Sequence, residues 1–373
     1  MHATSLNDAL SLRVPIFQGP MTGSDTPALA AAVSASGGLG MLGCGMRSPQ
    51  AMAQAAAQVR QATDRPFGMN LFVQDTPVPD AATVEAALAR LAPLYAEFGL
   101  EPTVPERWCE DFGEQLDALI AARPAVASFT FGILSAAQVE RLHGAGCRVI
   151  GTATTVAEAL AWADVGADAV CASGMEAGGH RGTFLAVNGG RRERPSLTDF
   201  AAAMVGTLPL VAQCVDALAP RGIPVVAAGA IMDGRGIAAA QALGAQAVQM
   251  GTAFLACDES GISPAYRTAL LAATATDTLT TGALTGRPAR GIVNTLMQRL
   301  HPHEAEVPAY PVQNALTGAL RRASAQAGRG DYLSLWAGQG VARVRPMPAA
   351  ALMALLEQEW RSARAALAGQ DRA

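Results

Sequence analysis

The chain has 373 residues, of which 50% are hydrophobic and 16% charged, and its net charge is −4. This length suits one large domain or two, and the composition is that of a folded globular protein. The charge excludes a basic surface for nucleic acid or an anionic membrane, no run resembles a transmembrane helix, and the N-terminus lacks a signal-peptide pattern. We therefore expect a cytoplasmic protein with a small-molecule ligand, no nucleic-acid partner and no membrane partner.

All 27 basic residues are arginine. The absence of lysine excludes enzymes that form a Schiff base through a lysine, and it excludes a P-loop. The six cysteines show no C-x-x-C pair and no regular spacing, so we expect reduced, buried thiols rather than disulfides or a zinc site.

Short apolar runs bounded by glycine alternate with stretches of helical character along the chain. A glycine-led pattern repeats at four of the strand entries, as GCRV, GADAV, GIPV and GAQAV. This alternation predicts a TIM barrel, with a doubly wound open sheet as the alternative. The eight predicted strands are residues 14–18, 39–43, 67–73, 126–131, 148–152, 169–173, 224–228 and 247–251.

Residues between the strands carry helix-start patterns. Ser135-x-x-Gln138 and Thr155-x-x-Glu158 are typical of capping boxes, and Asp233 is placed to cap a later helix. We assign residues 1–257 to the barrel, with insertions near 74–125 and 183–221 that exceed normal connections. The mostly helical remainder, 258–373, is predicted to form a C-terminal cap that completes the substrate pocket.

Glycine-containing turns follow the seventh and eighth strands, at 228–230 and 249–252. In a TIM barrel these loops commonly bind phosphate through close backbone N–H groups. The turns therefore predict a phosphorylated ligand or cofactor, although the glycines could also serve only to make tight turns.

His180 follows the sixth strand, directly after Gly178 and Gly179. Because a histidine titrates near neutral pH, it can act there as a base, an acid or a hydrogen-bond donor. The alternative is a surface histidine beside Arg181. Glu176 could orient His180, although a solvated carboxylate is the simpler interpretation.

Two further groups favour no special site. His301 and His303 flank a proline, which fixes a loop rather than a helix face bearing two ligands, so we predict no metal site. The cluster Arg191, Arg192 and Arg194 is interpreted as a solvated loop.

Several motifs, in this order, resemble the nitronate monooxygenase family, formerly called 2-nitropropane dioxygenases. The resemblance covers nearly the whole chain. It is carried by residues 14–23, 35–43, 68–72, 176–182, 227–236, 249–254, 285–291, 310–316 and 333–340.

The resemblance implies an FMN-dependent flavoprotein, with FMN held non-covalently at the barrel mouth. The implied reaction is the oxidation of alkyl nitronates, and of neutral nitroalkanes if these are accepted, by O2 to carbonyl compounds and nitrite. It makes His180 the catalytic residue. Together with the turns, it suggests as cofactor contacts Met21, Asn70, Ser173, Gly178, Gly229, Ala230, Gln249, Met250, Gly251 and Thr252.

The chain departs from the family pattern at two of these positions. Ser173 stands where the family often has glutamine, and Ala230 stands where it often has glycine, so Ala230 would offer its N–H if its φ is negative. Some members use a lysine near the substrate, for which Arg287 or Arg290 would have to substitute here. Tyr310 would reach the substrate from the cap.

Other functions remain open on the same barrel. One is an NAD(P)H-dependent reductase, acting on an enoyl-acyl-carrier protein or on a quinone. Another is a flavin-binding protein without turnover, because a fold does not determine a function.

Overall fold

The computed structural model describes residues 5–186 and 195–370, so the predicted arginine cluster at 191–194 lies outside the described residues. An eight-stranded parallel sheet has the order β1-β9-β8-β6-β5-β4-β3-β2, and a bridge between Phe17 and Leu39 joins its two edge strands. The TIM barrel prediction is therefore confirmed. Its strands are β1 (Ile16–Gln18), β2 (Gly40–Gly43), β3 (Phe67–Phe72), β4 (Val126–Thr130), β5 (Arg148–Ala153), β6 (Ala169–Ser173), β8 (Val225–Ala228) and β9 (Ala247–Met250).

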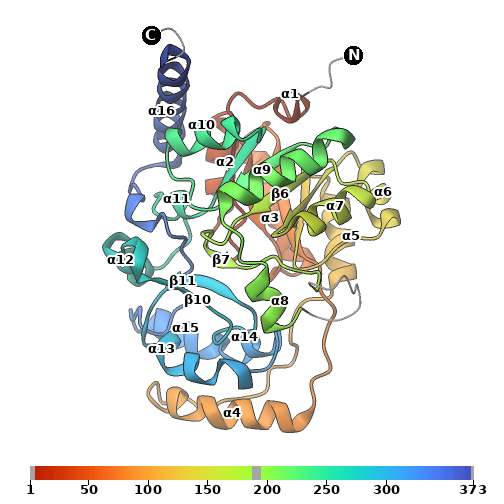
Figure 1. Cartoon of the computed structure of the whole chain (residues 1–373). Coiled ribbons are helices and arrows are strands. Elements are labelled where there is room, and N and C mark those ends of the chain that lie inside the picture. Colours follow the sequence, from red (N-terminus) through yellow and green to blue (C-terminus); the bar gives the residue numbers. More distant parts are fainter. Residues whose placement is uncertain (1–4, 187–194, 371–373) are drawn as a thin grey trace.

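Amphipathic helices surround this barrel (Figure 1). The last long helix of the chain, α16 (Ala349–Gln370), returns to the barrel and packs against both α10 and α2. Its buried residues, including Leu352 and Leu356, join the core between strands and helices. The other helices of the ring are α2 (Pro27–Ala35), α3 (Pro49–Ala62), α5 (Phe112–Ala122), α6 (Ala136–Gly144), α7 (Val156–Asp164), α9 (Thr207–Leu218) and α10 (Gly234–Ala242).

A second core lies outside the barrel, at the bottom of Figure 1. It joins the apolar face of α4 (Ala81–Ala96), from the first insertion, to helices of the C-terminal segment. Leu91 and Leu94 of α4 share this core with Leu296 and Leu320. Its other elements are α13 (Thr295–Leu300), α14 (Val312–Leu316) and α15 (Gly318–Gln326).

A small antiparallel sheet lies between the second core and the barrel, in the order β10-β11-β7. Its strands are β10 (Thr278–Thr281), β11 (Ala289–Ile292) and β7 (Gly179–His180). The remaining elements are α1 (Leu6–Ala9), α8 (Leu197–Ala202), α11 (Thr252–Leu255), α12 (Pro264–Ala272), and the 3-10 turns η1 (Ala219–Arg221), η2 (Ala275–Asp277), η3 (His301–Glu306) and η4 (Val341–Arg343).

Two of the three predicted helix starts are confirmed, and in the third the cap is present but the full capping box is not. Ser135 forms a complete capping box, and Asp233 caps α10. Thr155 caps α7, but the carboxylate of Glu158 turns to the preceding residue, where it accepts from the N–H and hydroxyl of Thr154. Glu158 is fully buried and also accepts from the N–H of Phe184, so it ties α7 to the segment after His180.

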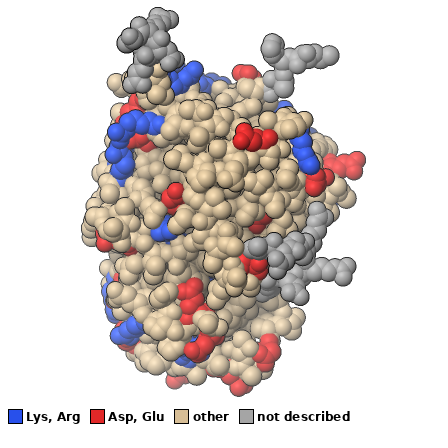
Figure 2. Space-filling model, in the orientation of Figure 1, with Lys and Arg blue, Asp and Glu red and all other residues tan. Residues whose placement is uncertain are grey.

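The distribution of surface charge and the burial of the cysteines match what the composition predicts. On the face shown in Figure 2, the positive and negative side chains among the described residues are scattered and gather in no patch of one sign. Five of the six cysteines are free and buried, and Cys109 is partly buried. Among the described residues, none of the helices combines the length and the apolar character needed to cross a lipid bilayer.

We predict that Leu91→Ala lowers the free energy of unfolding by about 2–5 kcal/mol, because it leaves a cavity in the second core. Chemical denaturation measures this loss. Leu208→Ala is the matched control, since its side chain is 61% exposed, and it should change stability by less than about 0.5 kcal/mol. Equal losses in the two variants would contradict the packing of α4 on the C-terminal segment.

Candidate active site

His180 is held by a strand that leaves the barrel. After β6 the chain turns and forms β7, which pairs with β11 so that His180 lies opposite Ala289 and Gly179 opposite Arg290. The next residue, Arg181, donates its N–H to the carbonyl of Pro288 at 2.8 Å. The backbone of His180 is thus fixed as part of the small sheet rather than carried on a free loop.

The side chain of Arg181 also holds the segment that carries His180. Its side chain is 1% exposed, and its guanidinium donates to the carbonyl oxygens of Gly174 at 2.6 Å and Ser173 at 3.0 Å, at the end of β6. Burial lowers the pKa of Arg181 to about 10, yet the group stays charged at neutral pH. Arg181 is therefore a core residue that supports the segment carrying His180, which is itself partly buried.

Glu176 has a structural role. Both of its carboxylate oxygens accept from the N–H of Thr207, at 2.9 and 3.1 Å, and one also accepts from the Thr207 hydroxyl at 2.7 Å. Thr207 is the first residue of α9, where a negative charge is favourable. The carboxylate of Glu176, which we expected to be solvated, therefore caps the N-terminus of α9.

Three aromatic rings surround the imidazole of His180. The ring centroids of Trp336, Tyr310 and Phe131 lie 5.2, 5.4 and 5.5 Å from it. Burial, followed by repulsion from Arg287 and Arg321, lowers the pKa of His180 from its ordinary value to about 3. The imidazole is therefore neutral at physiological pH, and its Nε2 lies 2.9 Å from the Oγ1 of Thr285.

Phe131 stands out among these rings because of its backbone. It follows β4 with a φ of +77°, a conformation that is unfavourable for a bulky residue. Its ring stacks on Phe72 at 4.3 Å, and the guanidinium of Arg287 lies 4.1 Å from its centroid. Backbone strain of this kind is concentrated at functional sites, and nothing in the sequence pattern predicts it at Phe131.

Arg287 and Arg290, the two predicted substrate cations, both bind backbone carbonyls. Arg287 donates to the carbonyls of Arg181 at 2.9 Å and Thr183 at 2.5 Å, while stacking on Phe131. Arg290 donates to the carbonyl of Met175 at 3.0 Å. Both side chains therefore hold the segment on either side of His180, and of the two only Arg287 acts on its pKa.

Arg321 is a third cation that the sequence reasoning missed. Its guanidinium donates to the carbonyl and side-chain oxygens of Asn314, at 2.6 and 2.9 Å, and to Ser334 at 3.1 Å. No carboxylate among the described residues forms an ion pair with it. Burial lowers its pKa to about 10, and its charge acts on both Tyr310 and His180.

Glycines bring several backbones together at the barrel mouth. Gly178 is exposed there, but a Cβ on it would lie 2.5 Å from the nitrogen of Gly338, so only glycine fits. The N–H of Gly338 in turn donates to the Oγ1 of Thr252 at 3.0 Å. The segment after Trp336 therefore packs onto the turns that follow β6 and β9.

Backbone donors remain available at these turns. Gly229 has a φ of +125° and Ala230 a φ of +52°, so the negative φ considered for Ala230 is wrong, and the availability of its N–H rests instead on the lack of an acceptor. Within the described residues, no acceptor contacts the N–H groups of Ala230 or Gly251. A Cβ on Gly251 would meet only Met21, at 3.8 Å, so the space in front of this turn is open.

The other predicted cofactor contacts lie at strand ends of the same mouth. Asn70 is buried on β3 and donates to the Oγ of Ser128 at 2.9 Å. The side chain of Met250 is buried in the core, so only its backbone can face a ligand. Ser173 and Gln249 are partly buried at the ends of β6 and β9.

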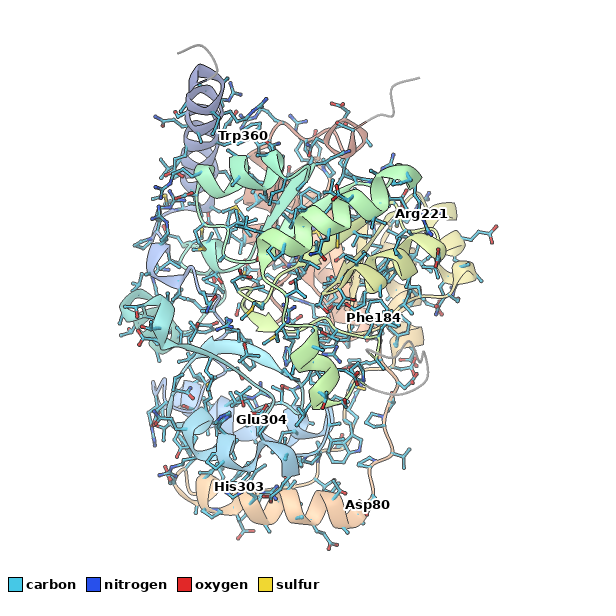
Figure 3. All side chains as sticks on the ribbon, viewed as in Figure 1. Asp80, Phe184, Arg221, His303, Glu304 and Trp360 are labelled. Carbon is cyan, nitrogen blue, oxygen red and sulfur yellow. The ribbon has the colours of Figure 1, made fainter. Side chains whose placement is uncertain are left out.

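His301 and His303, for which no metal site is predicted, each lie beside a carboxylate. His301 pairs with Glu304 at 2.8 Å, and His303 lies 3.5 Å from Glu306. His303 and Glu304 are on the lobe farthest from the barrel (Figure 3). No group of three potential ligands occurs among residues 5–186 and 195–370.

A cavity of about 560 Å³ lies at the opposite end of the barrel from His180. It is lined by residues that precede the strands, such as Pro66, Cys147 and Asp168. In TIM barrels the active site is at the other end, where the strands terminate, and His180 and the glycine turns are found there.

Comparison with known proteins places the chain in a family. The family model described as nitronate monooxygenase matches residues 3–359. A probable nitronate monooxygenase from Staphylococcus saprophyticus is 41% identical over 352 residues, covering 94% of this chain and 96% of the relative. One from Staphylococcus haemolyticus is 42% identical over 335 residues, covering 90% of each chain.

Solved structures agree. A nitroalkane oxidase from Streptomyces ansochromogenes has a TM-score of 0.87 and 41% identity, covering 96% of this chain and 99% of its own. FabK from Thermotoga maritima has a TM-score of 0.75 and 30% identity, covering 99% and 100%. The match of the family model across most of the chain, with relatives above 40% identity over nine tenths of it, shows that this protein belongs to the nitronate monooxygenase family.

Proposed function

We propose that this protein is a cytoplasmic, FMN-dependent enzyme that oxidises alkyl nitronates with O2 to carbonyl compounds and nitrite. The observation that carries the proposal is the position of His180, which is neutral and surrounded by aromatic rings at the end of the barrel where the glycine turns lie. Family membership supports the choice of reaction.

The mouth fits a flavin nucleotide. The N–H groups of Ala230 and Gly251 would hold its phosphate, since both lack an acceptor among the described residues and Gly251 faces open space. Met21, Asn70 and the turn at 249–252 would contact the rest of the cofactor. When bound, FMN supplies the transfer of electrons between substrate and O2.

The side chains around His180 suit a small anion with an apolar substituent. The rings of Phe131, Tyr310 and Trp336 offer apolar contact and exclude water, which strengthens electrostatic interactions inside the site. Arg321 contributes a partly buried positive charge that attracts the nitronate group. Burial raises the pKa of Tyr310, so its hydroxyl stays protonated and can donate to a nitronate oxygen.

We predict that the purified protein carries FMN and that a nitronate reduces it. The protein should absorb in the visible range, and mass spectrometry of the released cofactor should identify FMN. Under anaerobic conditions, propionate 3-nitronate should bleach the absorbance, whereas NADH or NADPH should not. Rapid bleaching by NADH alone would favour the reductase alternative, and a spectrum unchanged by every reagent would favour flavin binding without turnover.

We predict that His180→Asn lowers kcat/KM for a neutral nitroalkane by at least about a hundredfold, because positioned acid–base groups contribute on this order. The variant should retain FMN and its visible absorbance, since the glycine turns that would bind the cofactor are unchanged. The control is His143→Asn, which changes a histidine beside Asp168 at the opposite end of the barrel and should leave turnover unchanged. Unchanged kinetics in His180→Asn would remove this residue from the proposed mechanism.

We predict that activity on a neutral nitroalkane persists well below the ordinary pKa of histidine. The pKa of His180 is lowered to about 3, so its neutral form survives as the pH falls through about 6.5, where a free imidazole becomes protonated. The pH profile of kcat/KM should therefore show no acidic limb near 6.5. By the same shift the unfolded chain takes up this proton first, so the contribution of His180 lowers folding stability progressively below about pH 6.5. A limb at the ordinary histidine value would contradict the burial of this ring.

A further inference from the structure

Thr285 is a buried residue whose hydroxyl contacts two acceptor-bearing groups of the active site. It lies in the turn between β10 and β11 and is 0% exposed. Its Oγ1 lies 2.9 Å from the Nε2 of His180 and donates to the carbonyl oxygen of Arg287 at 3.2 Å. A carbonyl oxygen can only accept a hydrogen bond, so the hydroxyl proton is needed there.

We propose that Thr285 is a positioning residue that fixes the tautomer of His180, so that Nε2 carries the proton and Nδ1 is the catalytic base. A hydroxyl has one proton and free lone pairs. Because that proton points to the carbonyl of Arg287, Oγ1 accepts from the Nε2–H of His180. The second ring nitrogen then keeps its lone pair.

The surroundings of the ring agree with one proton on it. Three aromatic rings pack around His180, and the low pKa of this residue favours the neutral imidazole. Within the described residues, Nδ1 has no hydrogen-bond partner. The side chain is only partly buried, so Nδ1 can meet a ligand.

This inference rests on the proposed function and defines what His180 contributes to it. A neutral nitroalkane must lose an α-proton before it becomes a nitronate. In this step the α C–H bond breaks, the proton moves to Nδ1, and the electron pair remains on the substrate as the nitronate. The resulting imidazolium still donates from Nε2 to Thr285, and the adjacent anion stabilises its charge.

A substrate that is already a nitronate does not need this proton transfer. Loss of the tautomer control should therefore affect the two substrates unequally. A defect in folding, in cofactor binding or in general access to the site would lower both. The ratio of the two turnover rates thus separates a positioning role for Thr285 from a merely structural one.

The test compares Thr285→Val, Thr285→Ser and wild type, each loaded with FMN. With nitroethane, Thr285→Val should lose on the order of tenfold to a hundredfold in kcat, since it leaves Nε2 without its acceptor. With ethyl nitronate it should stay within about threefold of wild type, a difference too small to reflect loss of a catalytic base. Thr285→Ser keeps the hydroxyl and should restore nitroethane turnover.

Thr317→Val is the matched control. Thr317 is also 0% exposed, and its hydroxyl donates to the carbonyl of Leu284 at 3.0 Å without contacting His180. The substitution Thr317→Val therefore removes a buried threonine hydroxyl, as Thr285→Val does, from the same C-terminal segment. The variant should keep the wild-type ratio of the two substrates even if its thermal stability falls.

Nitrogen-15 NMR of histidine-labelled protein reads the tautomer without any turnover. The chain has five histidines, and the spectrum of His180→Asn assigns the missing resonances to His180. Wild type and Thr285→Ser should show a protonated Nε2 and an unprotonated Nδ1, whereas Thr285→Val should shift toward a mixture.

Two results would overturn the inference: a protonated Nδ1 in the wild-type spectrum, or an equal loss on both substrates in Thr285→Val. The proposed function fails separately, if neither substrate is oxidised. In that case the NMR result still decides whether Thr285 sets the tautomer.

Discussion

The two-residue pairing of β7 with β11 connects the barrel to the rest of the site. A histidine on the loop after β6 would otherwise sample many orientations, because such loops are held only at their ends. Pairing with Ala289 and Arg290 fixes its backbone, and β11 in turn bridges to Trp336 through Gly291. Two rings around His180, those of Tyr310 and Trp336, come from beyond the barrel, so the site exists only when both parts are in contact.

Two costly features support this arrangement. A buried guanidinium is unfavourable unless it is hydrogen-bonded, and the two terminal NH2 groups of Arg181 donate to carbonyls at the end of β6, while its Nε has no partner among the described residues. The left-handed backbone of Phe131 costs on the order of 1–3 kcal/mol. Its ring is held by stacking on Phe72 and by the guanidinium of Arg287. Stability is thus lost locally where the site gains fixed geometry.

Sequence patterns predicted the parts of the fold that depend on local burial. Strand β6 begins and ends where its apolar run does, and Asp233 caps α10 as its position indicates. Pairings between distant segments left no such pattern, because β7 is two residues long and α4 is paired with helices far along the chain. The roles of Thr285 and Arg321 depend on these pairings, so spacing alone could not indicate them. The strand end and the two glycines before it singled out His180, and the resemblance to the family then made it the catalytic candidate, whereas periodicity alone could not.

The second core also sets an order of events during synthesis. The apolar face of α4, including Leu91, emerges early, but its partners at 283–332 are made only near the end of the chain. The ring of helices around the barrel is likewise incomplete until α16 packs between α10 and α2. Contacts between such distant segments form slowly, because a long loop must close before they are made. Until then the nascent chain exposes apolar surface of the kind that chaperones bind.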